Sequence, residues 1–410
     1  MLLTVCSVSA RDFTIIGLPD TQYYTGHLFG GTPEIFQAQT QWIVDNKDSL
    51  NIVFVAHLGD VVEFGFREIE WRRADEAMRI LEDPQTTGLV DGIPFGLVLG
   101  NHDLPSQLYN RYFGIERFSG RDYYGGHYGR DNDNHFTLFS SGDLNLIAIF
   151  FEYTIQSGSP VLAWADSLLD VYSNRRAIIV HHSAAIGQGH PPDDKGEIIY
   201  EALKRHSGFF LLLCGHWGQE EWRGQVTFEG QTVYSLLSDY QTRNRGGDGW
   251  LRIMEFQPDH NLIWVKTYSP TLDRFETDES SQFTLPYDMQ SPTGISGEQT
   301  VPADFLLLKN YPNPFNTATT IHYTLPVQSG EFRVKGGEGT LHSEPFTPHV
   351  TLKIFNVMGQ EVAILRDEVQ EPGSYTVTWD ASDAGSGVYF CRLSIDNGRW
   401  SATKRMVVVK

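Results

Sequence analysis

Cysteine is scarce in this sequence. The 410 residues include only three, with Cys6 near the N-terminus and Cys214 and Cys391 far apart along the chain. This spacing argues against a disulfide framework, and the absence of a Cys-x-x-Cys pair excludes the usual cysteine-based zinc site. Hydrophobic residues make up 40% and aromatic residues 13% of the chain, so we expect apolar cores and not disorder.

Long apolar runs are also missing. No segment approaches the ~20 consecutive apolar residues of a membrane-spanning helix, so we predict no transmembrane segment. The first residues, MLLTVCSVSA, form a short apolar run that ends in small residues, as at a secretory cleavage site. Although a basic segment before the run is lacking, we interpret residues 1–10 as the remnant of a signal peptide. A first β-strand is the alternative.

Positively charged residues are fewer than negatively charged ones. The chain has 31 Lys and Arg against 51 Asp and Glu, which gives a formal net charge of -20. Such a chain repels polyanions, so we expect no general binding of nucleic acid through a basic face. The acidity also suits a protein that stays soluble outside the cell, although it is equally consistent with an ordinary solvated surface.

The length predicts more than one domain. Residues 11–288 alternate between short apolar runs and amphipathic stretches, the pattern of a layered α/β domain. Residues 289–303 are rich in Pro, Gly, Ser and Thr and read as a linker. Residues 304–410 contain short strands without a convincing helix, which predicts an all-β immunoglobulin-like sandwich. A polar Gly-rich insertion near 328–349 interrupts it.

Polar residues that can bind metal follow the apolar strands of the first domain. Because ligands bind outside the carboxyl ends of strands in α/β sheets, residues distant in sequence can converge there. Asp, Asn and His side chains suit a pair of divalent ions. Singly, each is more typical of a turn or a satisfied polar group, but their number and order favour a joint site. The candidates are Asp20, Gln22, Asp60, Asn101, His102, Asp103, His181, His182 and His216.

Neighbouring residues bear on this site. Gly59 and Gly100 precede Asp60 and Asn101, and Gly215 precedes His216, where the backbone is expected to turn sharply. His57 lies within a strand and is predicted to be structural. In the segment SDYQTRNRGG, Arg243 and Arg245 either hold a substrate phosphate or belong to an ordinary charged loop.

The segments DTQ, GD, GNHD, VHH and GHWG occur in this order. The pattern resembles the calcineurin-like metallophosphoesterase family over roughly residues 13 to 285. The resemblance implies a four-layer α/β/β/α sandwich with two divalent metals, which could be Mn, Fe, Zn, Mg or Ca. By position, Asp60 would bridge the metals. Asn101, His181 and His216 would complete one site, and Asp20 and Gln22 would serve the other.

The same resemblance implies how catalysis would proceed. Two cations would activate a water that attacks phosphorus, and His102, oriented by Asp103, would stabilise or protonate the leaving oxygen. His181 is preferred over His182 because it directly follows the strand RRAIIV, although the sequence does not separate them.

Two residues depart from the family pattern. Gln22 and Gly218 stand where histidines are usual, so the second site would be weaker and built from oxygen ligands, which suit a hard ion. Gln219 or Glu220 could compensate for Gly218.

The end of the chain carries a second resemblance. The segments NYPNPFN and NVMGQ and a closing strand that is first basic and then apolar resemble the C-terminal sorting domain of the bacterial type IX secretion system. The resemblance covers about residues 304–410 apart from the insertion. It implies that the type IX machinery exports the chain to the surface or surroundings of a bacterium with an outer membrane. A generic β-sandwich accessory module is the alternative.

These observations together predict a secreted, metal-dependent enzyme that hydrolyses small phosphate mono- or diesters. The competing hypothesis is a surface-displayed binding protein that keeps the fold without turnover. A nuclease is a third possibility that the acidity disfavours.

Overall fold

The computed structural model describes residues 12–189, 191, 193–218, 220–228, 230–290, 306–325, 349–357, 359–371, 373–395 and 400–410. The chain divides into two compact units, Met1–Ile295 and Ser296–Lys410. The predicted signal remnant, residues 291–303 of the predicted linker and residues 328–348 of the predicted insertion lie outside the described residues.

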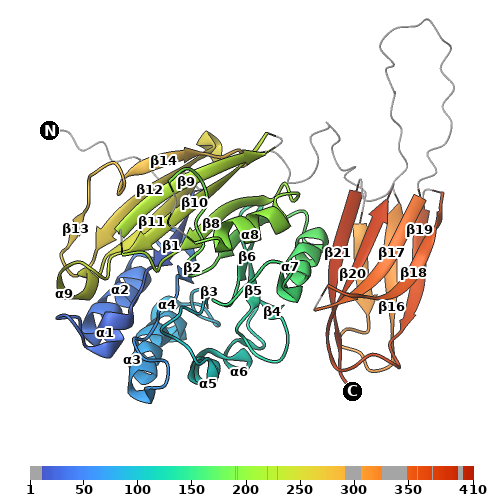
Figure 1. Ribbon diagram of the computed structural model, residues 1–410. Helices are drawn as coiled ribbons and strands as arrows, with labels where there is room; N and C mark the ends of the chain where they lie inside the picture. Colours follow the sequence, from blue (N-terminus) through green and yellow to red (C-terminus); the bar gives the residue numbers. More distant parts are fainter. Residues whose placement is uncertain are drawn as a thin grey trace, which may run out of the picture. The chain divides into compact units, whose positions relative to one another are not determined.

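The first unit contains two mixed β-sheets (Figure 1). In the first sheet, β1, β2 and β3 run parallel, and β11 pairs antiparallel with β1. The order is β13 (Arg274–Phe275), β12 (Leu262–Ser269), β11 (Leu251–Gln257), β1 (Phe13–Leu18), β2 (Ile52–His57), β3 (Phe95–Leu97), with β14 (Phe283–Pro286) paired to β12.

The second sheet has a parallel centre. Strands β6, β7, β8 and β10 run parallel, and antiparallel strands complete both edges. The order is β4 (Tyr124–His127), β5 (His135–Ser141), β6 (Leu144–Phe150), β7 (Arg176–Val180), β8 (Phe209–Cys214), β10 (Gln231–Asp239), β9 (Glu220–Phe228).

The two sheets pack face to face. Along β1, Phe13 and Ile15 join the core between the sheets, whereas Ile16 and Leu18 join the core on the opposite face, as the period-two alternation of a strand requires. Burial of each such side chain contributes about 2 kcal/mol before the entropy cost of folding.

Helices cover both outer faces of the paired sheets. The outer core of the first sheet is closed by α2 (Pro33–Asp45) and α3 (Glu68–Arg79). The second sheet is covered by α7 (Pro160–Val171) and α8 (Lys195–Leu203), and Phe136 of β5 packs against Trp164 of α7. The predicted four-layer α/β/β/α sandwich is confirmed.

Short helices occupy the connections. They are α1 (Gln22–Gly26), the 3-10 helix Ile80–Glu82, α4 (Pro84–Thr87), α5 (Gln107–Phe113), α6 (Ile115–Phe118), α9 (Asn244–Gly247) and the 3-10 helix Pro258–His260. Among the helices of the described chain, none is long and apolar enough to cross a membrane.

The second unit consists of two antiparallel sheets around one apolar core. One has the order β15 (Leu306–Tyr311), β16 (Ala318–Leu325), β19 (Gly373–Asp380). The other has the order β18 (Glu361–Val369), β17 (His349–Asn356), β20 (Gly387–Ile395), β21 (Trp400–Val408). The described part of this unit has no helix, so the predicted all-β architecture is confirmed.

Candidate metal and catalytic site

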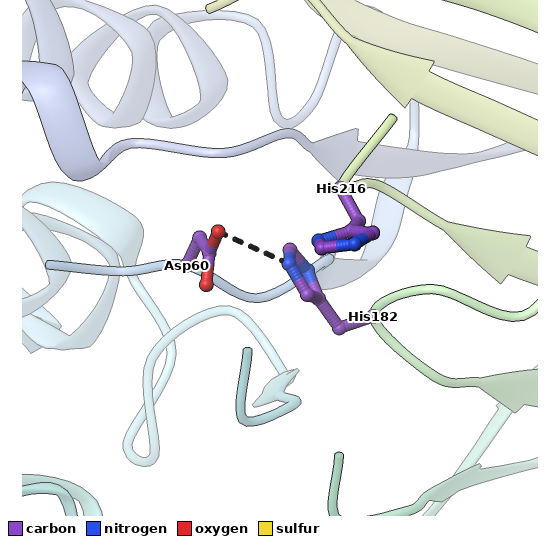
Figure 2. Close-up of side chains that lie close together, drawn as sticks. All are labelled: Asp60, His182 and His216. Atoms are coloured by element: carbon purple, nitrogen blue, oxygen red, sulfur yellow. Dashed lines mark ion pairs between the residues drawn. The ribbon is translucent and has the colours of Figure 1, made fainter. Parts of the chain in front are cut away.

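Three side chains from two different sheets meet at one point of the first unit. Asp60 follows β2 of the first sheet, and His182 and His216 follow β7 and β8 of the second. One ligand atom of each lies within 4.8 Å of the others. Figure 2 shows both imidazole rings facing the Asp60 carboxylate. The carboxyl ends of strands from both sheets therefore deliver a potential metal site.

Glycines allow this close approach. A Cβ atom on Gly100 would lie 2.1 Å from Oδ1 of Asp60, and a Cβ atom on Gly215 would lie 2.1 Å from Oδ1 of Asp20. Both distances are far inside van der Waals contact. The sequence suggested sharp turns as the reason for these glycines, but the structure shows that they leave room for the acidic side chains.

Two residues of the cluster have left-handed backbone conformations. The φ angles are 45° for Asp60 and 72° for His216. Residues other than glycine rarely adopt this backbone region. Those that do concentrate at functional sites, where the surrounding structure holds them in place. The His216 N–H also points to the Asp20 carboxylate, at 3.4 and 3.3 Å from its two oxygens.

The hydrogen bonds of His181 and His182 distinguish these two neighbours. Nδ1 of His182 lies 2.8 Å from the carbonyl oxygen of Leu58, so this nitrogen carries a proton. In the neutral ring, Nε2 then has a lone pair, and it lies 3.1 Å from Oδ2 of Asp60. In His181, Nδ1 accepts the N–H of Ser183 at 3.2 Å, so the proton is on Nε2.

The sequence favoured His181 as the metal ligand, but in this structure His182 is the member of the pair that joins Asp60 and His216. His182 presents an available nitrogen to the cluster, whereas the tautomer of His181 presents a proton. Both residues are fully buried, so burial does not separate them. The two rings differ in their hydrogen-bond partners, which are the Leu58 carbonyl oxygen for His182 and the Ser183 N–H for His181.

Besides Asp60 of the cluster, three further buried carboxyl groups interact with it electrostatically, from Asp20, Asp103 and Asp239. Burial raises the pKa of Asp20 well above its usual range, and the Asp239 carboxylate raises it further. Burial also raises the pKa of Asp103 to about 7 and that of Asp239 to about 6. So many buried acids are costly unless positive charge compensates them.

His182 and Asp60 influence each other strongly. Burial lowers the pKa of His182, but the Asp60 and Asp20 carboxylates outweigh it and raise the value to about 10. Burial raises the pKa of Asp60, but His182 outweighs it and holds the value below its usual range. These carboxylates therefore attract positive charge to the position between them and the imidazole.

Two buried amide oxygens fit the same chemistry. Oδ1 of Asn101 and Oε1 of Gln22 have no hydrogen-bond partner among the residues that the structure describes. An unsatisfied buried carbonyl oxygen costs about 1–3 kcal/mol, and a hard cation is a suitable partner for it. The donor set thus fits divalent metal ions.

His102 lies beside the cluster and is partly exposed. Its backbone N–H donates to Oδ1 of Asp60 at 2.9 Å, and the ring atom Nδ1 lies 3.0 Å from the carbonyl oxygen of Glu63. The Glu63 carboxylate is 3.5 Å from the same nitrogen. Glu63 therefore orients this imidazole, although its place in the segment GDVVEFG was the only sequence signal for it.

Asp103 does not contact the His102 ring, contrary to the sequence-based expectation. Its two carboxylate oxygens accept the backbone N–H groups of Val62 at 3.0 Å and Gly100 at 2.8 Å. The side chain is fully buried and ties the connection after β2 to the connection after β3. Its role in this geometry is to shape the two loops that carry Asp60 and Asn101.

Two further residues near the cluster were not named individually as candidates from the sequence, although Asp239 belongs to the segment SDYQTRNRGG. The ring of Tyr153, which follows β6, lies 5.9 Å from His182 and 5.8 Å from His216, centroid to centroid. Asp239, the last residue of β10, is fully buried. Its only signal was its position at a strand end within the segment SDYQ.

His57 was the remaining histidine considered from the sequence. His57 is buried, which lowers its pKa to about 3, and its Nε2 lies 3.0 Å from Oγ1 of Thr21. This agrees with the structural role expected for it.

The two arginines and Gly218 are engaged within the protein. Arg243 pairs with Glu276, and Arg245 lies 2.7 Å from Asp248, so both guanidinium groups already have carboxylate partners. A Cβ atom on Gly218 would lie 2.6 Å from Cγ2 of Thr242. Gln219 and the side chain of Glu220, considered as substitutes for the missing histidine, lie outside what the structure describes.

Several known proteins are similar to this chain in sequence or fold. The chain is 30% identical to the uncharacterized protein YvnB of Bacillus subtilis (strain 168) over 299 residues, which cover 68% of this chain but only 22% of that relative. The purple acid phosphatase PPD1 of yellow lupin is 11% identical, with a TM-score of 0.43 and coverage of 72% of this chain and 58% of that structure. The protein TT1561 of Thermus thermophilus is 12% identical, with a TM-score of 0.38 and coverage of 65% and 98%.

Family models match both parts of the chain. The model for the secretion system C-terminal sorting domain matches residues 309–409. The model for the calcineurin-like phosphoesterases matches residues 13–220, about half of the chain, including Asp60, His182 and His216. The protein therefore belongs to the calcineurin-like phosphoesterase family and carries a C-terminal secretion sorting domain.

Proposed function

We propose that this protein hydrolyses phosphate mono- or diesters outside the cell, with water activated at a site for two divalent cations. The observation that carries the proposal is the convergence of Asp60, His182 and His216. The unpaired buried amide oxygens of Asn101, which follows β3, and Gln22, which follows β1, supply further candidate ligands, because buried polar groups are normally paired.

The donors would divide between two cations. His182, His216, Asn101 and Asp60 would hold one, and nitrogen ligands open this site to Zn or Fe as well as Mn. Asp20, Gln22 and the shared Asp60 would hold the other with oxygen alone, which favours Mn, Mg or Ca. The bound cations would neutralise phosphate oxygens and favour deprotonation of the attacking water.

His102 is placed to assist the leaving group. Its Nδ1 faces the Glu63 carbonyl oxygen, so the opposite ring nitrogen, Nε2, is available to a substrate. In the protonated ring, Nε2 would donate a proton to the ester oxygen as its bond to phosphorus breaks, the attacking water would release one proton to solvent, and the ring would regain a proton from solvent. The hydrogen bond from the His102 N–H to Asp60 keeps the backbone at this position close to the metal ligands.

The sorting domain determines where this chemistry would occur. Domains of this kind direct a protein to the type IX secretion machinery, which makes the chain a secreted phosphoesterase-type protein. We propose that the native setting is the surface or surroundings of a bacterium with an outer membrane. The signal peptide remnant at residues 1–10 stays a prediction.

A non-catalytic surface-displayed binding protein is the second candidate. The observation in its favour is Gly218, which supplies no ligand and whose side-chain position is crowded by Thr242. If the second cation binds too weakly, the fold and one metal would remain without turnover.

The test is hydrolysis of p-nitrophenyl phosphate and bis-p-nitrophenyl phosphate by the full chain, first depleted of metal and then supplied with Mn²⁺. Turnover that disappears in Asp60→Ala and Asn101→Ala, but persists in the exposed control Asp143→Ala, would support the enzyme. Bound metal without turnover on either ester, with any divalent ion, would favour the binding protein.

A further inference from the structure

Three side chains linked by hydrogen bonds, those of Asp239, Gln241 and Gln22, connect the end of β10 to the candidate second metal site. We propose that Gln241, anchored by Asp239, is a positioning residue that directs the Gln22 amide oxygen toward the second cation. This inference rests on the proposed function, since it concerns the metal site on which that function depends.

The contacts are direct. Oδ1 of Asp239 accepts the backbone N–H of Gln241 at 3.0 Å, and Oδ2 accepts the side-chain amide Nε2 of Gln241 at 2.9 Å. Oε1 of Gln241 in turn accepts the amide Nε2 of Gln22. The side chains of Asp239 and Gln22 are almost fully buried, with 0% and 2% of their surface exposed, whereas Gln241 between them is partly exposed.

The donor-to-acceptor direction of these hydrogen bonds determines the orientation of both amide groups. An ionised carboxylate only accepts hydrogen bonds, so Asp239 selects the NH₂ group of Gln241. The oxygen of Gln241 then faces Gln22 and selects its NH₂ group. The remaining oxygen of Gln22 therefore points away from Gln241, and it is the atom without a hydrogen-bond partner in the described part of the chain.

The orientation matters because an amide has two unlike ends. The last torsion of a glutamine side chain is soft and roughly two-fold, so an unanchored amide would present NH₂ hydrogens to the cation in part of the population. Hydrogens repel a cation, whereas the oxygen ligates it. A histidine or carboxylate ligand does not need an amide relay of this kind, so Gln241 compensates for a feature particular to Gln22.

The loop that carries Gln241 is itself held in place. Oγ1 of the adjacent Thr242 donates to the carbonyl oxygen of Gly218 at 3.3 Å, and the Gly218 position has space only because it lacks a side chain. The turn after β10 therefore docks against the connection after β8, which keeps Gln241 at a defined distance from Gln22.

The experiment measures Mn²⁺ binding to the metal-depleted full chain by titration followed with electron paramagnetic resonance, so that its readout does not depend on turnover. We expect two ions per wild-type chain. In Gln241→Leu, the tighter ion should be retained and the weaker should lose about tenfold or more in affinity, the usual cost of removing an outer partner of a metal ligand. Asp239→Asn should act in the same direction, because its amide no longer selects one orientation of Gln241.

Two further variants make the result specific. Gln39→Leu removes another buried glutamine, whose Nε2 donates to the Trp250 carbonyl oxygen at 2.8 Å, and should leave both ions bound even if stability falls. The double variant Gln22→Glu with Gln241→Leu should regain the weaker ion, because the two carboxylate oxygens are equivalent and need no orientation.

Wild-type binding of fewer than two ions, or a folded Gln241→Leu chain that binds the second ion within about twofold of the wild type, would overturn the inference. Two bound ions without ester hydrolysis would contradict the proposed function alone.

Discussion

The Nδ1 atom of His182 lies 2.8 Å from the carbonyl oxygen of Leu58, a residue 124 positions earlier in the chain. This contact places the ring proton on Nδ1 and turns Nε2 toward Asp60. Metal-binding histidines are commonly held in this way by a backbone carbonyl behind the ring. The relationship makes the two adjacent histidines of the segment VHH unequal, and their variants should behave differently.

His182→Ala should therefore abolish tight binding of the first cation, with a loss of affinity of at least about 100-fold, because a direct ligand matters more than an outer partner. His181→Ala should retain the cation and mainly lower the free energy of unfolding, by about 1–3 kcal/mol, because it removes a buried ring that accepts the Ser183 N–H. Metal content and urea unfolding of both variants check this. Equal metal loss in both would contradict the assignment.

Glu63 and Asp103 should likewise separate activity from stability. Glu63→Gln removes the negative charge 3.5 Å from Nδ1 of His102 but keeps the carbonyl contact, so kcat should fall by about tenfold without loss of metal. Asp103→Asn replaces one of two oxygens that accept backbone N–H groups and should lower the free energy of unfolding by about 1–3 kcal/mol.

The measurements are steady-state kinetics on a phosphate ester, metal content, and urea unfolding of both variants. A large loss of kcat in Asp103→Asn at unchanged stability, with Glu63→Gln unaffected, would restore the expected pairing of Asp103 with His102.

The close contact at Gly100 can be tested with one methyl group. In Gly100→Ala, the added carbon would meet Oδ1 of Asp60, so the carboxylate must move and the metal ligands lose their alignment. We expect activity to fall by about 100-fold, the typical result of displacing a reacting group by about 1 Å. Gly385→Ala is the matched control, because an added methyl there meets nothing within 4 Å. Normal activity and metal content in Gly100→Ala would contradict the close-contact explanation.

A buried histidine away from the metal site should influence acid stability. Burial lowers the pKa of His135 to about 3, so the unfolded chain binds more protons than the folded chain between about pH 3 and 6.5. The contribution of this residue to the free energy of unfolding is thus complete above pH 6.5 and is lost as the pH falls through that window. One such group adds a slope of up to about 1.4 kcal/mol per pH unit.

His135→Gln should remove that slope. Urea unfolding of the metal-free protein at several pH values between about 4.5 and 6.5 measures it, with the wild type compared under the same conditions. A variant curve as steep as the wild-type curve would show that His135 does not stay neutral in the folded protein.

The location of the site could be predicted from the sequence because it depends on short-range patterns. Apolar runs that end in GD, GNHD or GH determine where strands stop and which polar residues follow, and the carboxyl ends of strands are where α/β proteins bind ligands. The cluster of Asp60 and His216 and the buried, unsatisfied oxygens of Asn101 and Gln22 agree with that logic.

The sequence by itself determined the order of strands and polar residues, the two family patterns and the site's general place. Only the tertiary structure decided which of these side chains lie together. His182, whose ring meets a carbonyl on the connection after β2, joins the cluster in place of His181. The His102 ring lies against Glu63 in place of Asp103, and Gln241 hydrogen-bonds to Gln22 across 219 positions of the chain. The physical reason is that hydrogen bonds depend on direction over about 3 Å, and this direction is set by groups from other connections of the fold that spacing along the sequence does not reveal.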